Sequence, residues 1–231
     1  MRKVLLLLLA PAFLLTSCRN EDDPTGPGSG TNNGPKTGST FTYDYEVRGQ
    51  ENEIIDEGST VQTLVKANTS AYGRSNVWIY VDNENDTNWY AKSSNGDVAT
   101  YIDLASAETI GLGQAFWINF PTSGGPGEDR VLAEQEVEYH GVPAVLRATL
   151  NSEFDGNEQI TIGTKTYPVK VASSTIELEV LVGGQVVNTG VLVDGSFWWI
   201  PELNASAGTQ QMIEGENTYF FAQELVQVNV K

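Results

Sequence analysis

Residues 165–200 read KTYPVKVASSTIELEVLVGGQVVNTGVLVDGSFWWI, and this run determines the fold class that the sequence predicts. Apolar and polar residues alternate along it, β-branched residues are frequent, and glycine interrupts it, a pattern typical of strands joined by tight turns. Gly183-Gly184 and Asp194-Gly195 are expected to form the turns, because these residues tolerate positive φ. The predicted strands of this antiparallel meander are Lys165–Ala172, Thr175–Val182, Gln185–Val193 and Ser196–Ile200.

The same pattern extends upstream of this run. Val131–His140 and Val142–Leu150 are predicted strands that meet at Gly141. Asp155-Gly156 lies between apolar segments and predicts a two-residue hairpin, since both positions tolerate φ > 0. Glu158–Ile162 is then expected to be the next strand.

The chain is also rich in predicted strands nearer its start. Phe41, Tyr43 and Tyr45 alternate with polar residues, which is the period of a half-buried strand. Aromatic and β-branched residues favour strands at several later positions. These further predicted strands are Val61–Lys66, Asn76–Val81, Asn88–Lys92, Val98–Asp103, Gln114–Phe120, Gln210–Ile213 and Thr218–Val230.

Two segments separate these strands more widely. Leu104–Gly113 leaves room for a single helical turn, and Pro121–Asp129 is predicted to be a loop that divides two halves of one sheet. No helical period persists for three turns, and no repeat of fixed period is visible. The sequence therefore predicts a single all-β domain at residues 41–231, a strongly curved antiparallel sheet or open barrel. A β-sandwich stays open as the alternative, because strand count and alternation look alike in both.

One section of this domain resembles a known family. The segments Ile160–Val171 and Phe197–Leu203 are similar to the closing section of the DUF3108-like proteins, also called the TapB-like family. In that family a Gly-Thr-aromatic strand precedes a Trp or Tyr pair and a Gly-containing turn, and here Asn204–Gly208 stands in place of that turn. The resemblance implies a strongly curved antiparallel sheet in an extracytoplasmic β-protein. The resemblance implies no catalytic residues at any position of this chain.

The first residues of the chain have the composition of a secretory leader. Arg2 and Lys3 precede an apolar run, Val4–Leu15, which is shorter than the roughly 20 residues that span a bilayer. Leu15-Thr16-Ser17-Cys18 resembles the lipobox of bacterial lipoproteins, in which the cysteine is acylated after the leader is removed. We therefore expect residues 1–17 to be a lipoprotein signal peptide and Cys18 to be the lipidation site. An ordinary signal peptide and a transmembrane helix are the alternatives.

The residues after Cys18 bear on where the protein is anchored. Arg19, and not Asp, follows the cysteine, which in lipoprotein sorting implies the outer membrane. The acidic run Asn20–Asp23 resembles signals for display at the cell surface, or it is simply the solvated start of a linker. Residues 18–40 are rich in Gly, Pro, Ser and Asn, so we expect a flexible tether with a reach on the order of 25 Å.

The charge of the chain disfavours several partners. Removal of Arg2 and Lys3 from the 13 basic residues leaves 11 against 30 acidic residues, a formal net charge of −19. Nucleic-acid binding and direct adhesion to anionic lipid are disfavoured, because both depend on Lys and Arg. Cys18 is the only cysteine, so the mature domain is expected to have no disulfide and to rely on burial and backbone hydrogen bonds.

Few residues suit catalysis or metal binding. His140 is the only histidine, and no Gly-x-Ser-x-Gly motif occurs. Glutamates at positions 134, 136 and 138, and at 177 and 179, share strand faces that are expected to be wet, which does not separate carboxyl pKa values as a glycosidase requires. Asp82–Asn88 resembles a calcium loop but has Thr87 and Ser93 where an EF-hand needs Gly and Glu, so a hairpin turn is favoured. We expect no catalytic residue, metal or cofactor.

Tryptophans are the remaining candidates for a ligand site, namely Trp89, Trp117, Trp198 and Trp199. Trp198 and Trp199 are adjacent on a predicted strand and must point to opposite faces, and Trp89 and Tyr90 must do the same. An outward ring could stack on a sugar, and inward rings could line an apolar cavity. The simpler interpretation is that both faces are covered by other parts of a sandwich or closed barrel.

These observations favour a non-enzymatic envelope lipoprotein. Its most favoured role is as a carrier of an apolar ligand, which predicts a lined cavity. The alternative is a surface module that binds carbohydrate or protein, which predicts an exposed aromatic patch. A hydrolase that uses a carboxylate pair is the third hypothesis. The oligomeric state is left open by the sequence.

Overall fold

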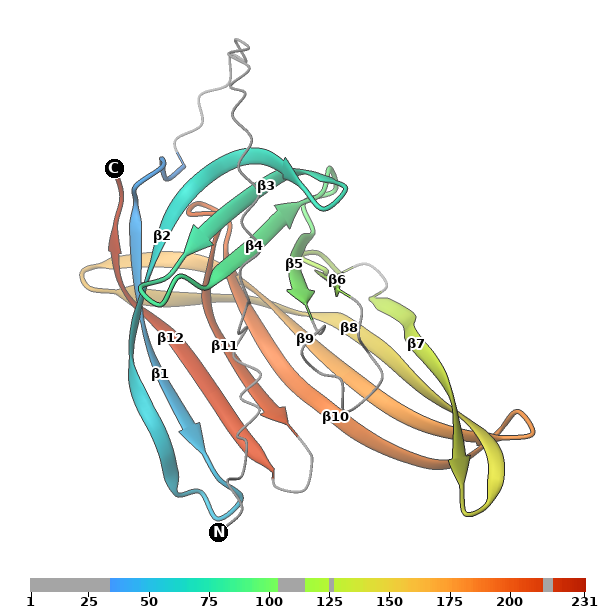
Figure 1. The fold of residues 1–231 in the computed structure, drawn as a ribbon. Helices are drawn as coiled ribbons and strands as arrows, with labels where there is room; N and C mark the ends of the chain where they lie inside the picture. The colour runs from blue at the N-terminus through green and yellow to red at the C-terminus, as the bar shows by residue number, and fades with distance from the viewer. Residues whose placement is uncertain (1–33, 104–114, 125–126, 214–217) are drawn as a thin grey trace.

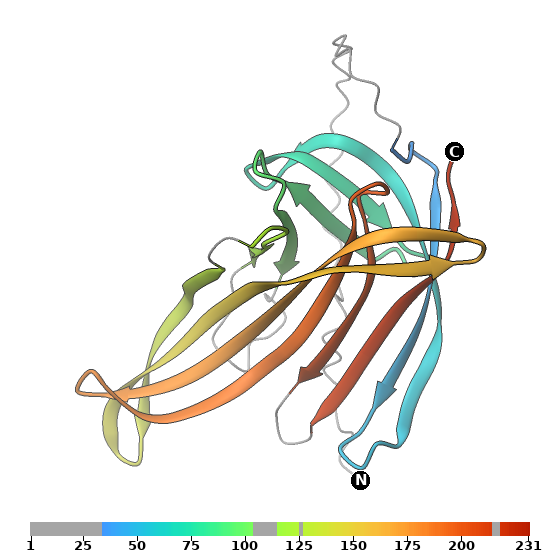
Figure 2. The same cartoon turned by 180° about the vertical axis from the view of Figure 1, so that it is seen from behind.

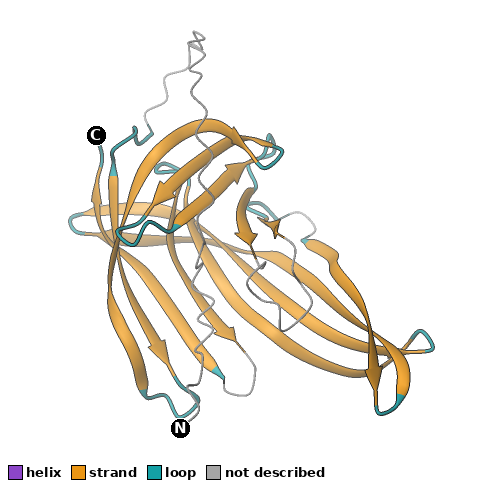
Figure 3. Cartoon of the chain, in the orientation of Figure 1, coloured by secondary structure: helices purple, strands orange, loops and turns teal. Residues whose placement is uncertain are grey.

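The computed structural model describes residues 34–103, 115–124, 127–213 and 218–231. The predicted signal peptide, Cys18, most of the tether and the Leu104–Gly113 segment lie outside these ranges. The described residues form twelve strands, and Figure 3 shows no helix among them. The strands are β1 Thr40–Arg48, β2 Ile54–Ala71, β3 Arg74–Val81, β4 Thr87–Lys92, β5 Val98–Asp103, β6 Ala115–Phe120, β7 Glu128–Tyr139, β8 Val142–Ile162, β9 Lys165–Val182, β10 Gln185–Ile200, β11 Ala205–Ile213 and β12 Tyr219–Asn229.

All twelve strands belong to one antiparallel sheet in the order β6-β5-β4-β3-β2-β1-β12-β11-β10-β9-β8-β7. Neighbours in sequence are neighbours in the sheet, except that β6 and β7 form its two opposite edges. The two halves of the chain are joined where β12 pairs with β1. The sheet curls so strongly that β3–β6 lie over the concave side of β9–β11 (Figure 1, Figure 2). The predicted all-β, strongly curved open sheet is confirmed, and the sandwich alternative is not the architecture found.

The loop after β6 connects the two strands that form the opposite edges of this sheet. β6 ends at Phe120 and β7 begins at Glu128, and these two strands lie at opposite ends of the strand order. The prediction that this loop divides two halves of one sheet is therefore confirmed. Residues 125–126 of the loop lie outside the described ranges.

Two of the predicted turns are wrong. Asp155-Gly156 lies inside the 21-residue strand β8, where Gly156 has a φ of +144° next to a register shift against β9. Asp194-Gly195 lies inside β10, where a Cβ on residue 195 would come within 2.5 Å of the Gln210 carbonyl oxygen. Both glycines therefore serve bending and close strand approach within long strands rather than chain reversal. The break predicted at Gly141 and the turn predicted at Gly183-Gly184 are confirmed, although His140, predicted to end the strand, belongs to the first of these turns.

Aromatic side chains fill the concave side of the sheet. Trp199 is 2% exposed, and its ring centroid lies 5.4 Å from that of Tyr90 and 6.1 Å from that of Phe197. Phe197 also stacks on Phe120 of β6 at 4.5 Å, so the two limbs of the curled sheet meet through their rings. This contact buries large apolar surface, which stabilises the curl.

Buried tyrosines add hydrogen bonds to this core. The Tyr43 hydroxyl donates to the Ser206 carbonyl oxygen at 3.0 Å, and the Tyr80 hydroxyl donates to the Asn204 carbonyl oxygen at 2.7 Å. Burial raises the pKa of Tyr43 and Tyr80 well above the ordinary value, and it raises the pKa of Tyr90 as well. The three phenols therefore stay neutral at physiological pH.

Among the residues that the structure describes, no helix is long and apolar enough to cross a membrane.

Candidate functional site

The structure divides the four candidate tryptophans among three places. Trp199 belongs to the packed core, and Trp198, its neighbour on β10, points to the opposite face, where its Nε1 donates to Glu158 at 3.2 Å. Trp89 and Trp117 belong to a separate group on the face of β3–β6 that is turned away from the main core. The site is therefore built around Trp89 and Trp117.

Strand alternation explains this second face. Tyr90 and Ile118 point into the main core, so Trp89 and Trp117 beside them on β4 and β6 point outward. Trp117 pairs across the ladder with Tyr101 of β5, which places the two rings on the same face.

Four aromatic residues form what we name the outer aromatic cluster: Tyr72, Trp89, Tyr101 and Trp117. Tyr72 stacks on Tyr101 with ring centroids 4.0 Å apart and 6° between the planes. Trp89 meets Tyr72 edge-on at 5.3 Å and Tyr101 edge-on at 5.7 Å. Tyr101 lies 5.2 Å from Trp117. These spacings are those of attractive ring pairs, so the rings hold one another in fixed positions.

Tyr72 has an unusual backbone conformation in this cluster. It forms with Gly73 the two-residue loop between β2 and β3, and their φ values are +47° and +78°. Such a loop favours Asn-Gly, because a left-handed conformation is unfavourable for most other side chains. Tyr72 is nonetheless 54% exposed, so its ring is presented to solvent from a strained position.

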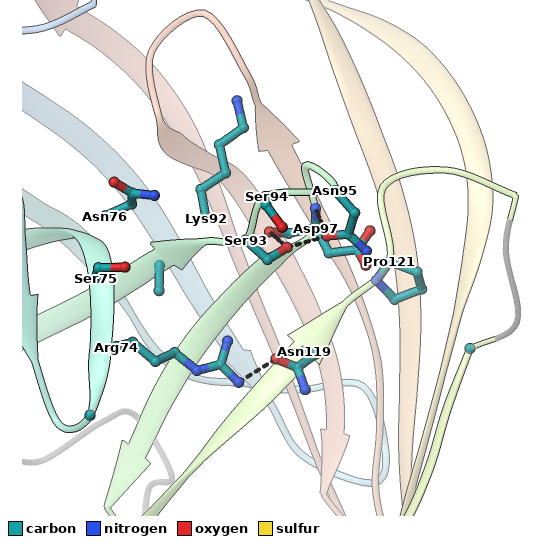
Figure 4. A pocket seen from close by; sticks show the side chains of 13 residues that line it. Arg74, Ser75, Asn76, Lys92, Ser93, Ser94, Asn95, Asp97, Asn119 and Pro121 are labelled. Carbon is teal, nitrogen blue, oxygen red and sulfur yellow. Dashed lines mark hydrogen bonds between the residues drawn. The ribbon is translucent and has the colours of Figure 1, made fainter.

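A pocket of about 700 Å³ adjoins the cluster and is named here the polar pocket (Figure 4). Three chain segments meet in it: the start of β3, the turn between β4 and β5, and the end of β6. Its described lining residues are Gly73, Arg74, Ser75, Asn76, Ala91, Lys92, Ser93, Ser94, Asn95, Asp97, Asn119, Pro121 and Gly127.

Arg74 lies between the polar pocket and the outer aromatic cluster. Its guanidinium carbon is 5.0 Å from the centre of the Trp117 ring, and its Nη2 donates to Asn119 Oδ1 at 2.6 Å. Trp117 in turn donates from Nε1 to the Tyr72 carbonyl oxygen at 3.1 Å. One chain of contacts therefore fixes the β2–β3 turn, the ring and the pocket wall together.

The turn between β4 and β5 is held by its own polar groups. Asp97 accepts the Thr122 backbone N–H at 3.0 Å through Oδ1 and the Asn95 side-chain amide at 2.5 Å through Oδ2. Ser93 donates its hydroxyl proton to Asn95 Oδ1. This wall of the pocket is therefore ordered by hydrogen bonds before any ligand arrives.

The chemistry of the site suits polar recognition beside an aromatic surface. Side-chain amides and hydroxyls can donate and accept, which matches the hydroxyl groups of a sugar. Ring faces can pack against the apolar C–H face of the same sugar. Sequence reasoning missed Tyr72, Tyr101 and the polar residues, because only the register of β3–β6 brings them to Trp89 and Trp117.

Residues considered for catalysis lie elsewhere. His140 is exposed in the β7–β8 turn, with its ring 4.3 Å from that of Tyr139. Arg147 of β8 lies between two glutamates, 2.7 Å from Glu134 and 3.6 Å from Glu179. These glutamates thus belong to a surface ion network.

The calcium-loop-like segment that begins at Asp82 is a hairpin turn between β3 and β4. Asp82 Oδ1 accepts the backbone N–H groups of Glu84 at 2.9 Å and Asp86 at 2.8 Å. This use of a carboxylate to cap its own turn is common for Asp. Within the described ranges, no group of three His, Cys, Asp or Glu residues is placed to hold a metal ion.

Comparisons with known proteins give matches only at the level of structure. No protein-family model matches the chain, so the resemblance to the DUF3108-like proteins has no support from that comparison, and no curated protein matches it either. An exported protein of Bacteroides fragilis, described as having a YmcC-like fold, is 11% identical at a TM-score of 0.42, covering 85% of this chain and 97% of its own. The lipoprotein YmcC of Escherichia coli is 10% identical at 0.35, covering 82% and 84%. A lipoprotein of Parabacteroides distasonis is 12% identical at 0.40, covering 87% and 100%.

Proposed function

We propose that this protein is a non-enzymatic lipoprotein of the cell envelope that binds a glycan at the outer aromatic cluster and the adjoining polar pocket. A sugar ring has an apolar face and a rim of hydroxyl groups. The aromatic rings of the cluster can pack against the apolar face of the sugar, and the amides and hydroxyls of the pocket can form hydrogen bonds with its hydroxyl groups.

The observation that carries this proposal is the conformation of Tyr72. A non-glycine residue in the left-handed region costs on the order of 1–2 kcal/mol, and a half-exposed ring recovers only part of that by packing. Strained positions of this kind are concentrated at binding sites, where the side chain has a use besides stability. The stacked, solvent-facing Tyr72 ring is therefore the expected contact for the sugar.

The hypothesis that the protein carries an apolar ligand, which the sequence favoured, has less support than the glycan site. The inward aromatic residues that would line its cavity are packed on one another, since Tyr90, Phe197 and Trp199 have centroids 5.4–6.3 Å apart. A lipid-sized ligand would have to separate these rings. We therefore place the surface site ahead of an interior one.

The proposed anchor is the lipid on Cys18, at the outer membrane. Its support is the leader and the lipobox-like residues described above, with Arg19 in the position that follows the cysteine. A Cys18→Ser chain is expected to move from the membrane fraction to the soluble fraction of cells. If the variant still sediments with membranes, acylation of Cys18 is not the anchor.

Two matched variants test the glycan site. Tyr72→Asn places the favoured residue in the β2–β3 turn, so the melting temperature should stay level or rise while glycan affinity falls about tenfold. His140→Asn makes the same change in the β7–β8 turn, where φ is +51° and +81°, and should leave binding unchanged. The full chain is purified in a sugar-free detergent, screened on a glycan array, and titrated with each hit by tryptophan fluorescence.

The same glycan experiments also test whether the protein binds at the proposed site and whether it is non-enzymatic. Binding that is equal in Tyr72→Asn and the unmodified chain would contradict the proposed site. A bound glycan recovered with unchanged mass supports a binding protein, whereas a shortened glycan would overturn the non-enzymatic assignment.

A further inference from the structure

We infer that β7 is a docking edge for an extended segment of a partner protein, which adds to the sheet as a further strand and alternates basic with apolar side chains. This inference goes beyond the proposed glycan site, because no residue of β7 belongs to the outer aromatic cluster or to the described lining of the polar pocket. It rests on the free backbone of β7 and on the side chains that its two faces present.

β7 forms the longer of the two edges of the sheet. It has 12 residues, whereas β6 at the other edge has 6. β7 pairs with β8 on one side, and no described strand pairs with it on the other. From Ala133 to Tyr139 the register with β8 continues without a shift, so this stretch is a regular strand. Every second residue of such a strand directs its N–H and C=O groups outward, where another strand can bond to them.

The contacts that join β7 to β6 leave this stretch open. Arg130, which donates to the Trp117 carbonyl oxygen, lies near the start of β7. Beyond it the strand runs away from β6 toward the β7–β8 turn (Figure 1, Figure 2). Residues 131–139 contain no Pro and no Lys, and the register shift of β7 lies before Ala133. The features that commonly block an exposed edge are therefore missing from this stretch.

One face of the stretch carries three exposed glutamates, Glu134, Glu136 and Glu138. Glu134 forms an ion pair with Arg147. Within the part of the chain that the structure describes, no basic side chain forms an ion pair with Glu136 or Glu138. Opposite charges at facing positions of neighbouring strands attract, so an added strand is expected to place Lys or Arg beside these two glutamates.

The other face of the stretch is mostly apolar. Ala133 packs with the buried Ala148 on the concave side of the sheet, and alternation assigns Val137 to the same side. Val137 is half-buried and pairs with Ala144, which is 6% exposed. Gln135, between Ala133 and Val137, is the polar exception. An added strand extends this surface if it turns apolar residues to the concave side, so its basic and apolar residues have to alternate.

Charge decides which segment fits this edge. A second copy of β7 would pair antiparallel across a two-fold axis, which sets the glutamates of the two copies opposite one another and is unfavourable. Residues 20–33, 104–114 and 214–217 of this chain contain no Lys or Arg, so they cannot supply the positive charge. A basic segment of another protein matches both the backbone and the charge of β7, and the formal net charge of −17 attracts it at long range.

Peptides test strand addition to the full chain in the sugar-free detergent. The probe is Lys-Val-Lys-Val-Lys-Val-Lys with blocked ends. One control peptide, Lys-Lys-Val-Val-Val-Lys-Lys, has the same composition without alternation. The other is the probe with every backbone nitrogen methylated, which keeps the charge and cannot donate hydrogen bonds to a strand. Fluorescence anisotropy should show the probe binding about tenfold more tightly than either control, and bound probe should slow hydrogen exchange of the β7 amides.

Two double variants with equal charge changes locate the binding site. Glu136→Gln with Glu138→Gln should lower the affinity for the probe about fivefold, because two cross-strand charge pairs are lost. Glu84→Gln with Glu224→Gln removes two exposed glutamates, in the β3–β4 turn and on β12, and should leave the affinity unchanged. Equal binding of the probe and either control peptide, or an equal effect of the two double variants, would overturn the inference.

Hydrogen exchange without peptide tests the other occupants of the edge. In the free chain, the amides of β7 that do not bond to β8 should exchange quickly. Protection of these amides at low protein concentration would show that another segment of this chain covers the edge, and protection that grows with concentration would show that a second copy does. Either result would overturn the inference of a partner strand, as would failure of the probe to bind.

Discussion

The hydroxyl group of Ser152 on β8 donates a hydrogen bond to the backbone carbonyl of Asn119 on β6, with 2.9 Å between the two oxygens. β6 is one edge of the sheet, and β8 lies next to the other edge. Arg130 of β7 makes a second link, from its Nη2 to the Trp117 carbonyl oxygen at 2.6 Å. Side chains therefore join the two ends of a sheet that its backbone ladder leaves open.

Loss of this link should weaken the protein at β6. Ser152 is 5% exposed, so Ser152→Ala is expected to lower the free energy of unfolding by about 1–2 kcal/mol and to speed hydrogen exchange of the β6 amides. Ser173→Ala removes an exposed hydroxyl that donates to Asp155 at 3.1 Å, and it should change stability by less than about 0.5 kcal/mol. Urea unfolding and exchange measurements would contradict the role of Ser152 if both variants behave alike.

Gly195 should tolerate substitution poorly, although it lies in a strand. A Cβ there would approach the Gln210 carbonyl oxygen to 2.5 Å, so Gly195→Ala is expected to destabilise the domain by about 2 kcal/mol or more. Gly190 lies on the same strand with no atom within 4 Å of the added Cβ. Gly190→Ala should therefore be neutral or slightly stabilising in the same thermal melts. A harmless Gly195→Ala would show that the strands can separate at this point.

The adjacent tryptophans of β10 should differ sharply in their contribution to stability. Trp199→Ala removes a ring that is 2% exposed, and we expect a loss of about 3–5 kcal/mol in the free energy of unfolding. Trp198→Ala removes a partly buried ring and its hydrogen bond to Glu158, so a loss of about 1–2 kcal/mol is expected. Denaturant titrations of the two variants measure the difference, and similar losses would mean that both rings are equally packed.

Alkaline solution should unfold the protein because of its buried tyrosines. Burial raises the pKa of Tyr43, Tyr80 and Tyr90 in the folded state above the ordinary value of 10.0, so the unfolded chain releases these protons first as pH rises. The contribution of these tyrosines to the free energy of unfolding is therefore fully present below about pH 10. Above that pH it falls by about 1.4 kcal/mol per pH unit for each tyrosine.

The Tyr90→Phe variant checks this slope. It retains the ring and removes one titrating group, so the fall in stability between pH 10 and pH 12 should be shallower by about 1.4 kcal/mol per pH unit. Guanidinium unfolding at a series of pH values measures both slopes. An unchanged slope would mean that Tyr90 ionises as readily in the folded protein as in the unfolded chain.

Much of the fold follows from local pattern. The alternation of apolar and polar residues predicts the strands, because one face of each is buried against the concave core. The two incorrect turns have a common cause. Aspartate-glycine pairs allow both chain reversal and a kink within a strand, and only the partner strand decides between them: β9 for Gly156 and β11 for Gly195.

The site was less predictable than the fold. Trp89 and Trp117 stood out by residue type, and alternation correctly separates Trp89 from Tyr90 and Trp198 from Trp199. The grouping of Trp89 and Trp117 with Tyr72 depends on the register of four strands and on the curl of β2, which no local pattern encodes. The polar pocket combines three chain segments far apart in sequence, so it too emerges only in the folded chain.

The left-handed Tyr72 has a consequence for the evolution of this protein. Asparagine or glycine would fit the β2–β3 turn better, so random substitution should replace tyrosine wherever selection for its ring is relaxed. Homologues that keep an aromatic residue at this position should then also keep Trp89 and Trp117, and those with Asn or Gly should have lost them. The residue at the position of Tyr72 in the β2–β3 turn would thus predict which homologues still bind the ligand.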